Sequence, residues 1–373
     1  MSSARATTLA QGFSQKLLLE MYDKSLLDSI VNRDYEGEIN DVGSKLNILN
    51  IARISEKTYS GANLTADDLY ENNCVLTIDQ WKSFYWKEKT IDNWQSYIKN
   101  PHATVVSQKA DERNKNMDSF ALGFYGDVAS GNRVGTPYTT GTVTVTATTG
   151  AVVGSGTTFT EAMEGQGFKA LGHTKWYRVK TFTDTTHITI EDDYDDTTSA
   201  YTGGAIEAGA TYEIESATKL QITPSNISKY VGALKLKLDK AEANGFSSVP
   251  DTDRYLIVPP EFEDVVTNNA TGITLHVPEV YTELVKKGMI TQLKGFNVMK
   301  SNRLTGNNTD GYHVIACHKN WMTFAEKLLK ADIEEDLIGN FGSAYKDLFV
   351  YGAKVPDSRR HFAAEGFWYF TNS

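Results

Sequence analysis

The densest group of possible metal ligands is a run of aspartates around one tyrosine, Asp192-Asp193-Tyr194-Asp195-Asp196. Such carboxylates could bind Ca²⁺, which takes about six to eight oxygen ligands. The run has no glycine at a bend and lacks the regular ligand spacing of a calcium loop. We therefore interpret it as a solvated turn between two strands and predict no metal site there.

Two further groups carry residue types that do chemistry elsewhere. His313, Cys317 and His318 offer soft and imidazole ligands, but on a strand the first two share one face and His318 points to the other. No second ligand pair completes a tetrahedral zinc site, so a structural strand is favoured. The glycine-rich segments at 155–158 and 203–204 lack the lysine and following helix of a phosphate loop, so we interpret them as hairpin turns.

Aromatic side chains crowd the segment from Trp81 to Trp94 and could form a platform for a sugar. In a strand, Trp81, Ser83 and Tyr85 would face one way, whereas Phe84 and Trp86 would face the other. A strand covered by its own core on one face and by a neighbouring subunit on the other explains this pattern without a ligand. We therefore predict intersubunit contacts at Trp81, Phe84, Tyr85 and Trp86.

Composition excludes several classes of function. The chain has 373 residues, 40% hydrophobic and 23% charged, which is ordinary for a globular protein. Its net charge of −10 argues against a general nucleic-acid binder. We find no Ser-His-Asp order, no catalytic carboxylate pair and no cofactor fingerprint, so we predict no catalytic residues and no cofactor. The lack of a long apolar run or signal core predicts neither a membrane partner nor export, and Cys74 and Cys317 are expected to be free thiols.

The periodicity of the chain predicts an α+β protein. Helices are expected at 13–31, 106–128, after Pro224 with Thr223 as N-cap, and at 280–285. Strands are expected at 45–54, 74–78, 254–258, 296–300, 312–317, 347–355 and 367–370. Between residues 139 and 214 threonine and glycine are frequent, proline and cysteine are absent, and short alternating runs are separated by turns. This composition predicts a small all-β module whose two ends lie close together.

Several phrases resemble one protein family. A buried strand, Arg254–Val258, ends in Pro259-Pro260-Glu261-Phe262, where Pro260 can begin a helix. Four further motifs occur in the order in which one family has them. They are Asn32–Ile39, Leu76–Lys82, Gly295–Leu304 and Gly352–Val355. Together they resemble the major capsid proteins of tailed bacteriophages, which have the HK-97-like fold.

The resemblance implies a domain plan and a function. It implies an N-terminal arm and helix (1–36), an extended β loop (37–92), and a peripheral domain with a spine helix (93–134). An inserted β-sandwich or barrel module (135–217), an axial α/β domain (218–345) and closing strands of the peripheral domain (346–373) follow. The implied function is self-assembly into pentamers and hexamers of an icosahedral shell around double-stranded DNA. Portal and scaffolding proteins are implied partners, the DNA is held by weak contacts, and the protein lies in the virion after assembly in the host bacterial cytoplasm.

Two alternatives stay open from the sequence. An encapsulin, a bacterial compartment shell of the same fold, would need no β module. A carbohydrate-binding adhesin would use the β module for its function, but it would be expected to carry an export signal. A module between the spine helix and the axial domain is expected to project from the outer surface of a shell.

Overall fold

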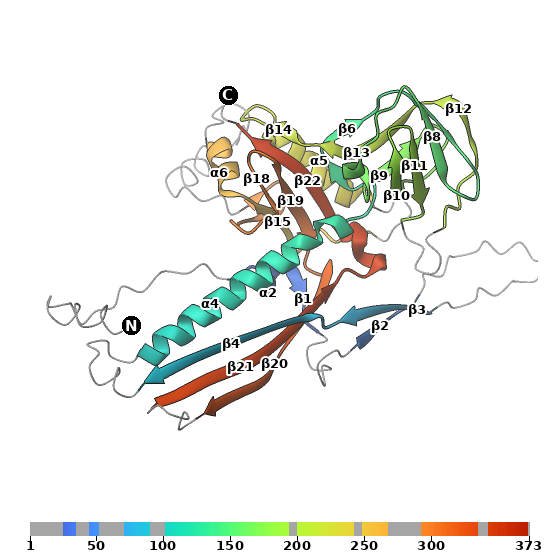
Figure 1. Cartoon of the computed structure of the whole chain (residues 1–373). Coiled ribbons are helices and arrows are strands. Elements are labelled where there is room, and N and C mark those ends of the chain that lie inside the picture. The colour runs from blue at the N-terminus through green and yellow to red at the C-terminus, as the bar shows by residue number, and fades with distance from the viewer. Residues whose placement is uncertain are drawn as a thin grey trace, which may run out of the picture.

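The computed structural model of the chain describes residues 25–34, 45–51, 71–89, 101–193, 200–241, 248–267, 292–334 and 342–371. Most of the expected helix at 13–31, all of the one at 280–285, and Trp94 lie outside these residues. Three larger sheets and one strand pair make up the fold (Figure 1). None of the described helices is long and apolar enough to cross a membrane.

A six-stranded mixed sheet forms the centre of the molecule. Its strands, in spatial order, are β14 (Leu220–Ile222), β22 (Ala363–Phe370), β19 (Gly311–His318), β15 (Arg254–Val258), β17 (Phe296–Lys300) and β16 (Gln292–Leu293). Two short strands join it: β5 (Arg133–Val134) pairs with β22, and β18 (Gly306–Asn307) pairs with β19. Strand β19 shows why the sheet is buried on both faces, since Val314 and Ala316 enter one apolar cluster whereas Ile315 and Cys317 enter another.

Two helices cover one face of this sheet. Helix α6 (Pro260–Thr267) begins at the proline after β15, as the sequence predicts. Helix α5 (Ile227–Asp239) buries Ile227, Val231, Leu234 and Leu238, also as predicted. The predicted cap was wrong, because the helix begins three residues after Pro224. The Thr223 amide donates to Oδ1 of Asn226 at 2.9 Å, and this turn occupies the residues before the helix.

A four-stranded sheet lies beside the first. Its order is β1 (Val31–Asn32), β20 (Met322–Glu334), β21 (Gly342–Lys354) and β4 (Gln80–Lys89). Helix α4 (Pro101–Leu122) runs along it and continues as a 3₁₀ helix, η2 (Gly123–Asp127), in agreement with the helix predicted at 106–128 (Figure 1). Strands β2 (Lys45–Ile51) and β3 (Glu71–Thr77) form a separate antiparallel pair.

Apolar clusters join these parts. The end of α4, the short helix α2 (Leu27–Ile30), β20 and β21 pack with the second face of the six-stranded sheet around Trp321. Strands β2 and β3 pack on Ala325 and Val350 of β20 and β21. Asp118 of α4, which is buried, pairs with Arg303 and accepts a hydrogen bond from Ser25 Oγ at 2.7 Å. Apolar contacts therefore connect the six-stranded sheet, the four-stranded sheet, the β2–β3 pair and their helices.

The β module, residues 136–218, has its own sheet and its own core. Its eight antiparallel strands follow the order β12 (Ile206–Ala210), β7 (Thr142–Val145), β8 (Ala151–Ser155), β11 (His187–Glu191), β10 (Tyr177–Asp184), β9 (Gly167–Ala170), β13 (Tyr212–Thr218) and β6 (Thr136–Tyr138). Valine, isoleucine and aromatic side chains from these strands form one separate cluster. Thr136 pairs with Thr218, which confirms that the two ends of the module lie side by side.

The later strands are distributed differently from the expected segments. Strand β20 falls within 218–345 but belongs to the four-stranded sheet, and β22 falls within 346–373 but lies between β14 and β19. The chain therefore crosses between the two sheets at Trp321 and returns after β21. The physical reason is that Trp321 is fully buried in the cluster shared by both sheets, where the crossing is anchored.

Candidate assembly surface and module joint

Strand β4 has two unlike faces. Phe84 and Trp86 are half-buried beneath α4, where Lys109 Nζ lies 5.6 Å from the Phe84 ring centroid and 5.2 Å from that of Trp86. Trp86 also stacks on Tyr345 of β21, with ring centroids 5.0 Å apart. These two predicted residues therefore contribute to the contact between helix and sheet.

The opposite face of β4 is open. Trp81 and Tyr85 are 57% and 56% exposed, and Lys87 Nζ lies 5.5 Å from the Tyr85 ring centroid. The alternation expected from the sequence is thus present, with Trp81, Ser83 and Tyr85 more exposed than Phe84 and Trp86. Large aromatic side chains left exposed together are typical of interaction surfaces.

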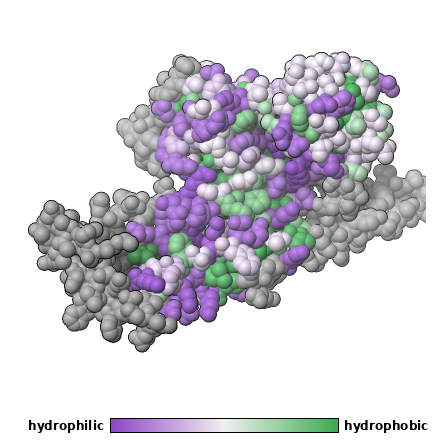
Figure 2. Space-filling view, in the orientation of Figure 1, coloured by the Kyte–Doolittle hydropathy of each residue, from purple (hydrophilic) through white to green (hydrophobic). Residues whose placement is uncertain are grey.

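The edges of this sheet are also open in the described part of the chain. There, β4 pairs only with β21, and β20 pairs only with β21 beyond Thr323. Leu328 and Ile333 of β20 are 50% and 58% exposed. In Figure 2 hydrophobic patches lie among hydrophilic ones over the region of α4 and this sheet. Unpaired strand edges beside apolar side chains favour pairing with another chain.

Asp347 holds α4 against the sheet. Its buried carboxylate pairs with Lys109, accepts a hydrogen bond from Arg113 at 3.0 Å, and accepts another from the Phe84 amide at 3.1 Å. Burial alone would raise the pKa of Asp347, but the hydrogen bonds from Lys109, the Phe84 amide and Arg113 outweigh it and lower the pKa. The carboxylate is therefore held in its charged form at the centre of the helix–sheet contact.

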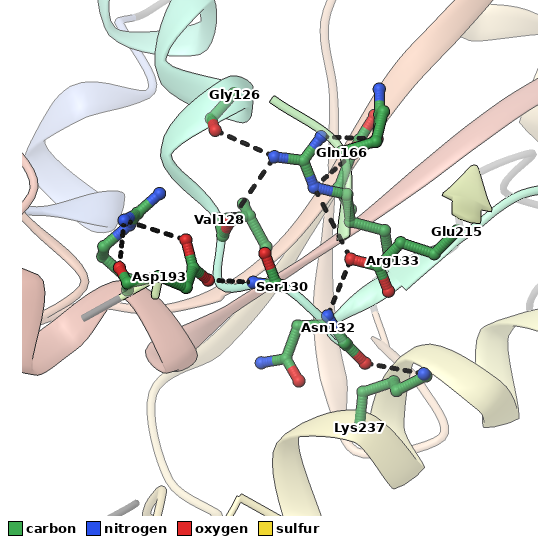
Figure 3. A network of polar contacts seen from close by, with 12 residues as sticks. Gly126, Val128, Ser130, Asn132, Arg133, Gln166, Asp193, Glu215 and Lys237 are labelled. Carbon is green, nitrogen blue, oxygen red and sulfur yellow. Dashed lines mark hydrogen bonds and ion pairs between the residues drawn. The ribbon is translucent and has the colours of Figure 1, made fainter. Parts of the chain in front are cut away.

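A buried polar network joins the β module to the central sheet (Figure 3). Arg133 of β5 donates to Gln166 of the module at 2.7 Å and to the Gly126 carbonyl at 2.9 Å. Its Nε lies 3.6 Å from Glu365 Oε2 and 4.0 Å from Glu215 Oε1. Arginine is suited to this position because its guanidinium has five donors in a fixed plane. Arg133, which belongs to the central sheet through β5, therefore also contacts the β module.

Asp193 of the acidic run belongs to this joint, and the interpretation of the run as a solvated turn was wrong for its two described aspartates, Asp192 and Asp193. Both are buried; Asp193 accepts a hydrogen bond from the Ser130 amide at 2.5 Å and pairs with Arg360 at 3.2 Å. Asp192 pairs with Lys175 within the module at 2.7 Å. Residues 194–199 lie outside the described part, and no cluster of three metal-ligating side chains occurs among the described residues.

Glu215 occupies the centre of the joint. Its Oε1 accepts a hydrogen bond from the Gly131 amide at 2.7 Å, and the Gly131 carbonyl accepts one from Lys237 Nζ at 2.6 Å. Gly131 has a φ of +90°, and a Cβ there would lie 2.5 Å from the Trp176 ring, so only glycine fits. Burial raises the pKa of Glu215 to about 7, although Arg133 and Lys237 lower it in part.

The other candidate metal ligands, His313, Cys317 and His318, contact protein groups that explain their positions without a metal. His313 bonds to Glu365 at 2.6 Å and stacks between Tyr125 and Phe367. Cys317 is buried in the apolar cluster around Trp321, and burial raises the pKa of its thiol to about 12. His318 Nδ1 accepts a hydrogen bond from the Asn320 amide at 3.1 Å. These three side chains therefore have separate partners and do not converge on one point.

The sequence analysis missed Arg133, Glu215, Arg360 and Glu365 as functional residues. They lie far apart along the chain, and only the pairing of β5 with β22 places Arg133 opposite Glu365. Alternation along β13 gives no signal for Glu215, because it places this residue on the face opposite to Tyr212 and Ile214, yet Glu215 is buried.

No known protein-family profile matches the chain, and no curated protein sequence matches it. Solved structures do match. A structure of Mycobacterium phage Che8 superposes with a TM-score of 0.57 at 17% identity and covers 97% of both chains. The capsid structure of cyanophage P-SCSP1u gives 0.55 at 14% identity, over 97% of this chain and 92% of that one. The capsid asymmetric unit of cyanophage Pam1 gives 0.55 at 11% identity, over 95% of each chain. The chain therefore shares its fold with proteins from solved phage capsids.

Proposed function

We propose that the chain is a major capsid protein that self-assembles into the icosahedral shell enclosing the double-stranded DNA of a tailed bacteriophage. The observation that carries the proposal is the fold likeness to the capsid structure of cyanophage P-SCSP1u, over 97% of this chain and 92% of that one. A match of this extent spans nearly the whole chain rather than one common motif.

The proposal assigns a role to each part of the fold as an HK-97-like subunit. Helix α4 is the spine helix, the β2–β3 pair is the base of the extended loop, and the six-stranded sheet is the axial domain. The β module is an inserted domain that projects from the outer surface of the shell. Residues 1–24 of the predicted N-terminal arm and helix (1–36) and residues 52–70 of the predicted extended loop (37–92) lie outside the described residues.

Assembly follows from the open sheet. Trp81 and Tyr85 would pack on a neighbouring copy, while Phe84 and Trp86 fix the strand to α4. Each such contact is weak, but every subunit makes several of them at once, so a closed shell is stable by multivalency. A structural role of this kind needs no catalytic residue and no cofactor.

The partners follow from the same proposal. Copies of this chain form pentamers and hexamers, portal and scaffolding proteins contact the shell, and packaged DNA meets it through weak contacts. A compartment shell that holds protein cargo and an adhesin that uses the β module are less favoured. The described edges and aromatic side chains of the four-stranded sheet support a role in contact between copies.

Electron cryo-microscopy of the purified full-length protein tests the proposal. We expect closed shells with pentamers and hexamers, in which the β module forms outer density. Particles isolated from infected cells should contain double-stranded DNA rather than a protein cargo. A protein that stays monomeric under all assembly conditions would contradict the proposal, and density for the module on the inner wall would contradict its assigned position.

A further inference from the structure

The joint between the β module and the central sheet has an unusual centre. Glu215 is buried there on β13, the strand by which the chain leaves the module (Figure 3). A buried carboxylate is stable in its charged form only when a cation and hydrogen bonds compensate for the lost water.

Compensation at Glu215 is incomplete. Oε1 accepts one hydrogen bond, from the Gly131 amide at 2.7 Å. Oε2 is buried without a hydrogen-bond partner in the described part of the chain. The nearest guanidinium nitrogen, Arg133 Nε, lies 4.0 Å away, beyond hydrogen-bond distance, while the other Arg133 nitrogens donate to Gln166 and Gly126. A proton on the carboxyl group removes the charge that these contacts leave uncompensated.

Charged groups from several elements act on Glu215. Arg133 of β5 and Lys237 of α5 favour its charged form, whereas Asp193, which follows β11, disfavours it. Two further charges pair with members of this set: Arg360 with Asp193, and Glu365 of β22 with Arg133. Glu365 shares Arg133 with Glu215 and also pairs with His313. The two carboxylates thus share one guanidinium, so the positive charge of Arg133 cannot fully neutralise both negative charges.

The chain connections at the joint allow the module to move as a body. Both connections lie side by side, because Thr136 pairs with Thr218 and Gly135 lies against Ser216. The module has its own apolar cluster, separate from those of the other sheets. A body with its own core on a narrow neck can rotate without unfolding, and the buried network is what holds it in one orientation.

We propose that the joint is a proton-dependent lock, in which a proton on Glu215 favours the closed orientation of the β module and loss of that proton loosens it. This inference does not depend on the proposed capsid function, since it concerns one chain and its internal joint.

The direction follows from linkage between protonation and closure. In the closed joint burial raises the pKa of Glu215 to about 7 from its ordinary value of 4.5. In an open joint water reaches the carboxyl group and its pKa returns toward the ordinary value. The closed state therefore binds the proton more tightly, so closure is favoured as pH falls through 7 and disfavoured as pH rises. The opening constant should be about tenfold larger at pH 8 than at pH 6.

Hydrogen exchange of the full-length protein, followed by mass spectrometry at pH 6 and pH 8, tests the lock. Rates are corrected for the intrinsic dependence of exchange on pH. The informative peptides contain the Ser130 and Gly131 amides, which donate to Asp193 and Glu215. Peptides from α5 serve as the internal reference. We expect about tenfold faster opening at pH 8 in the joint peptides and no matching change in α5.

Variants separate Glu215 from other titrating groups. Glu215→Gln copies the shape of the protonated side chain, so we expect slow exchange at both pH values. The matched control is Glu207→Gln, an exposed position on β12 of the same module, which should keep the wild-type dependence on pH. Wild-type exchange that is equal at both pH values, or faster at pH 6, would overturn the proposal even if Glu215→Gln does not fold. Persistence of the pH dependence in a folded Glu215→Gln protein would also overturn it.

Discussion

The β module and the four-stranded sheet are both built from antiparallel strands, but they differ in where their large side chains point. In the module, Phe168, Tyr177 and Tyr212 are buried in its own cluster. In the four-stranded sheet, Trp81, Tyr85 and Ile333 remain largely exposed. In the described residues, β4 pairs on one side only, and so does β20 beyond Thr323. The module therefore buries its large side chains within its own core, whereas the described part of the sheet leaves several of them exposed.

The two regions also differ in how polar groups are used. The module places buried charges at its joint with the rest of the chain, where Arg133 and Arg360 meet Glu215 and Asp193. The sheet buries Asp347 under α4 and leaves lysines exposed on its other face. Buried charge pairs fix geometry because removing one member leaves the other uncompensated. The module is thus oriented within the chain, and the open sheet is available for contacts between chains.

Among the variants that test this difference between module and sheet, Phe168→Ala should have the largest effect on stability. Phe168 is fully buried and stacks on Tyr212, with ring centroids 5.6 Å apart. We expect the free energy of unfolding of the module to fall by about 3–5 kcal/mol. Amide exchange should rise throughout the module and stay unchanged in α5, because the module has a separate core.

The matched control is Leu171→Ala in the same module, where the side chain is 72% exposed. We expect it to change stability by less than about 0.5 kcal/mol. If Phe168→Ala raised amide exchange in α5 as much as in the module, the module and α5 would unfold as one cooperative unit. The module would then not be a self-contained folded region.

Asp347→Asn should have an intermediate effect. We expect the free energy of unfolding to fall by about 2–3 kcal/mol, because Lys109 and Arg113 lose a charged acceptor. The lowered pKa of Asp347 predicts the direction in which its contribution to stability changes with pH. Its contribution is fully present above the ordinary pKa of 3.8 and is lost as pH falls below about 4. Urea unfolding of the wild type and variant between pH 7 and pH 3 should show their difference shrink at the acid end. A constant difference would argue against an electrostatic role.

Local patterns in the sequence were sufficient for much of the fold. The strand and helix around Pro260, the apolar face of α5 and the alternation along β4 depend on neighbouring residues, and each was predicted correctly. Within the module, alternating runs predict strands at 142–146, 176–182, 187–190 and 211–214, and β7, β10, β11 and β13 lie there. Strands β8, β9 and β12 were missed because each is short and interrupted by glycine or alanine.

The rest depends on contacts between distant residues. Nothing near Glu215 in the sequence indicates that Arg133, Lys237 and Glu365 will surround it, since sheet pairing and helix packing bring them together. The aspartate run illustrates the same limit: its composition indicates a solvated turn, but Arg360 and the Ser130 amide make Asp193 a buried contact. At the crossing from β19 to β20, Trp321 is likewise buried in a cluster formed by residues of both sheets, which no local signal in the sequence indicates.

Replacing both Trp81 and Tyr85 by serine should have the smallest effect on the stability of the subunit. More than half of each side chain already faces solvent, so little apolar contact is lost within the chain. We expect the free energy of unfolding to change by less than about 1 kcal/mol. Assembly should respond differently, because a contact repeated around a shell multiplies a small loss in each subunit. Light scattering and electron microscopy should show folded subunits that do not form closed particles.

Lys82→Ser is the control that makes this test specific to one face of β4. Lys82 is an exposed neighbour on the same strand, but it pairs in register with Phe349 and so lies on the side of α4. It should leave both stability and assembly unchanged, which would assign the defect to the face that carries Trp81 and Tyr85 rather than to the strand as a whole. Normal particles from the double variant would instead mean that this face stays open to water in the assembled protein. The open edges of β4 and β20 would then be the surfaces left to explain contacts between copies.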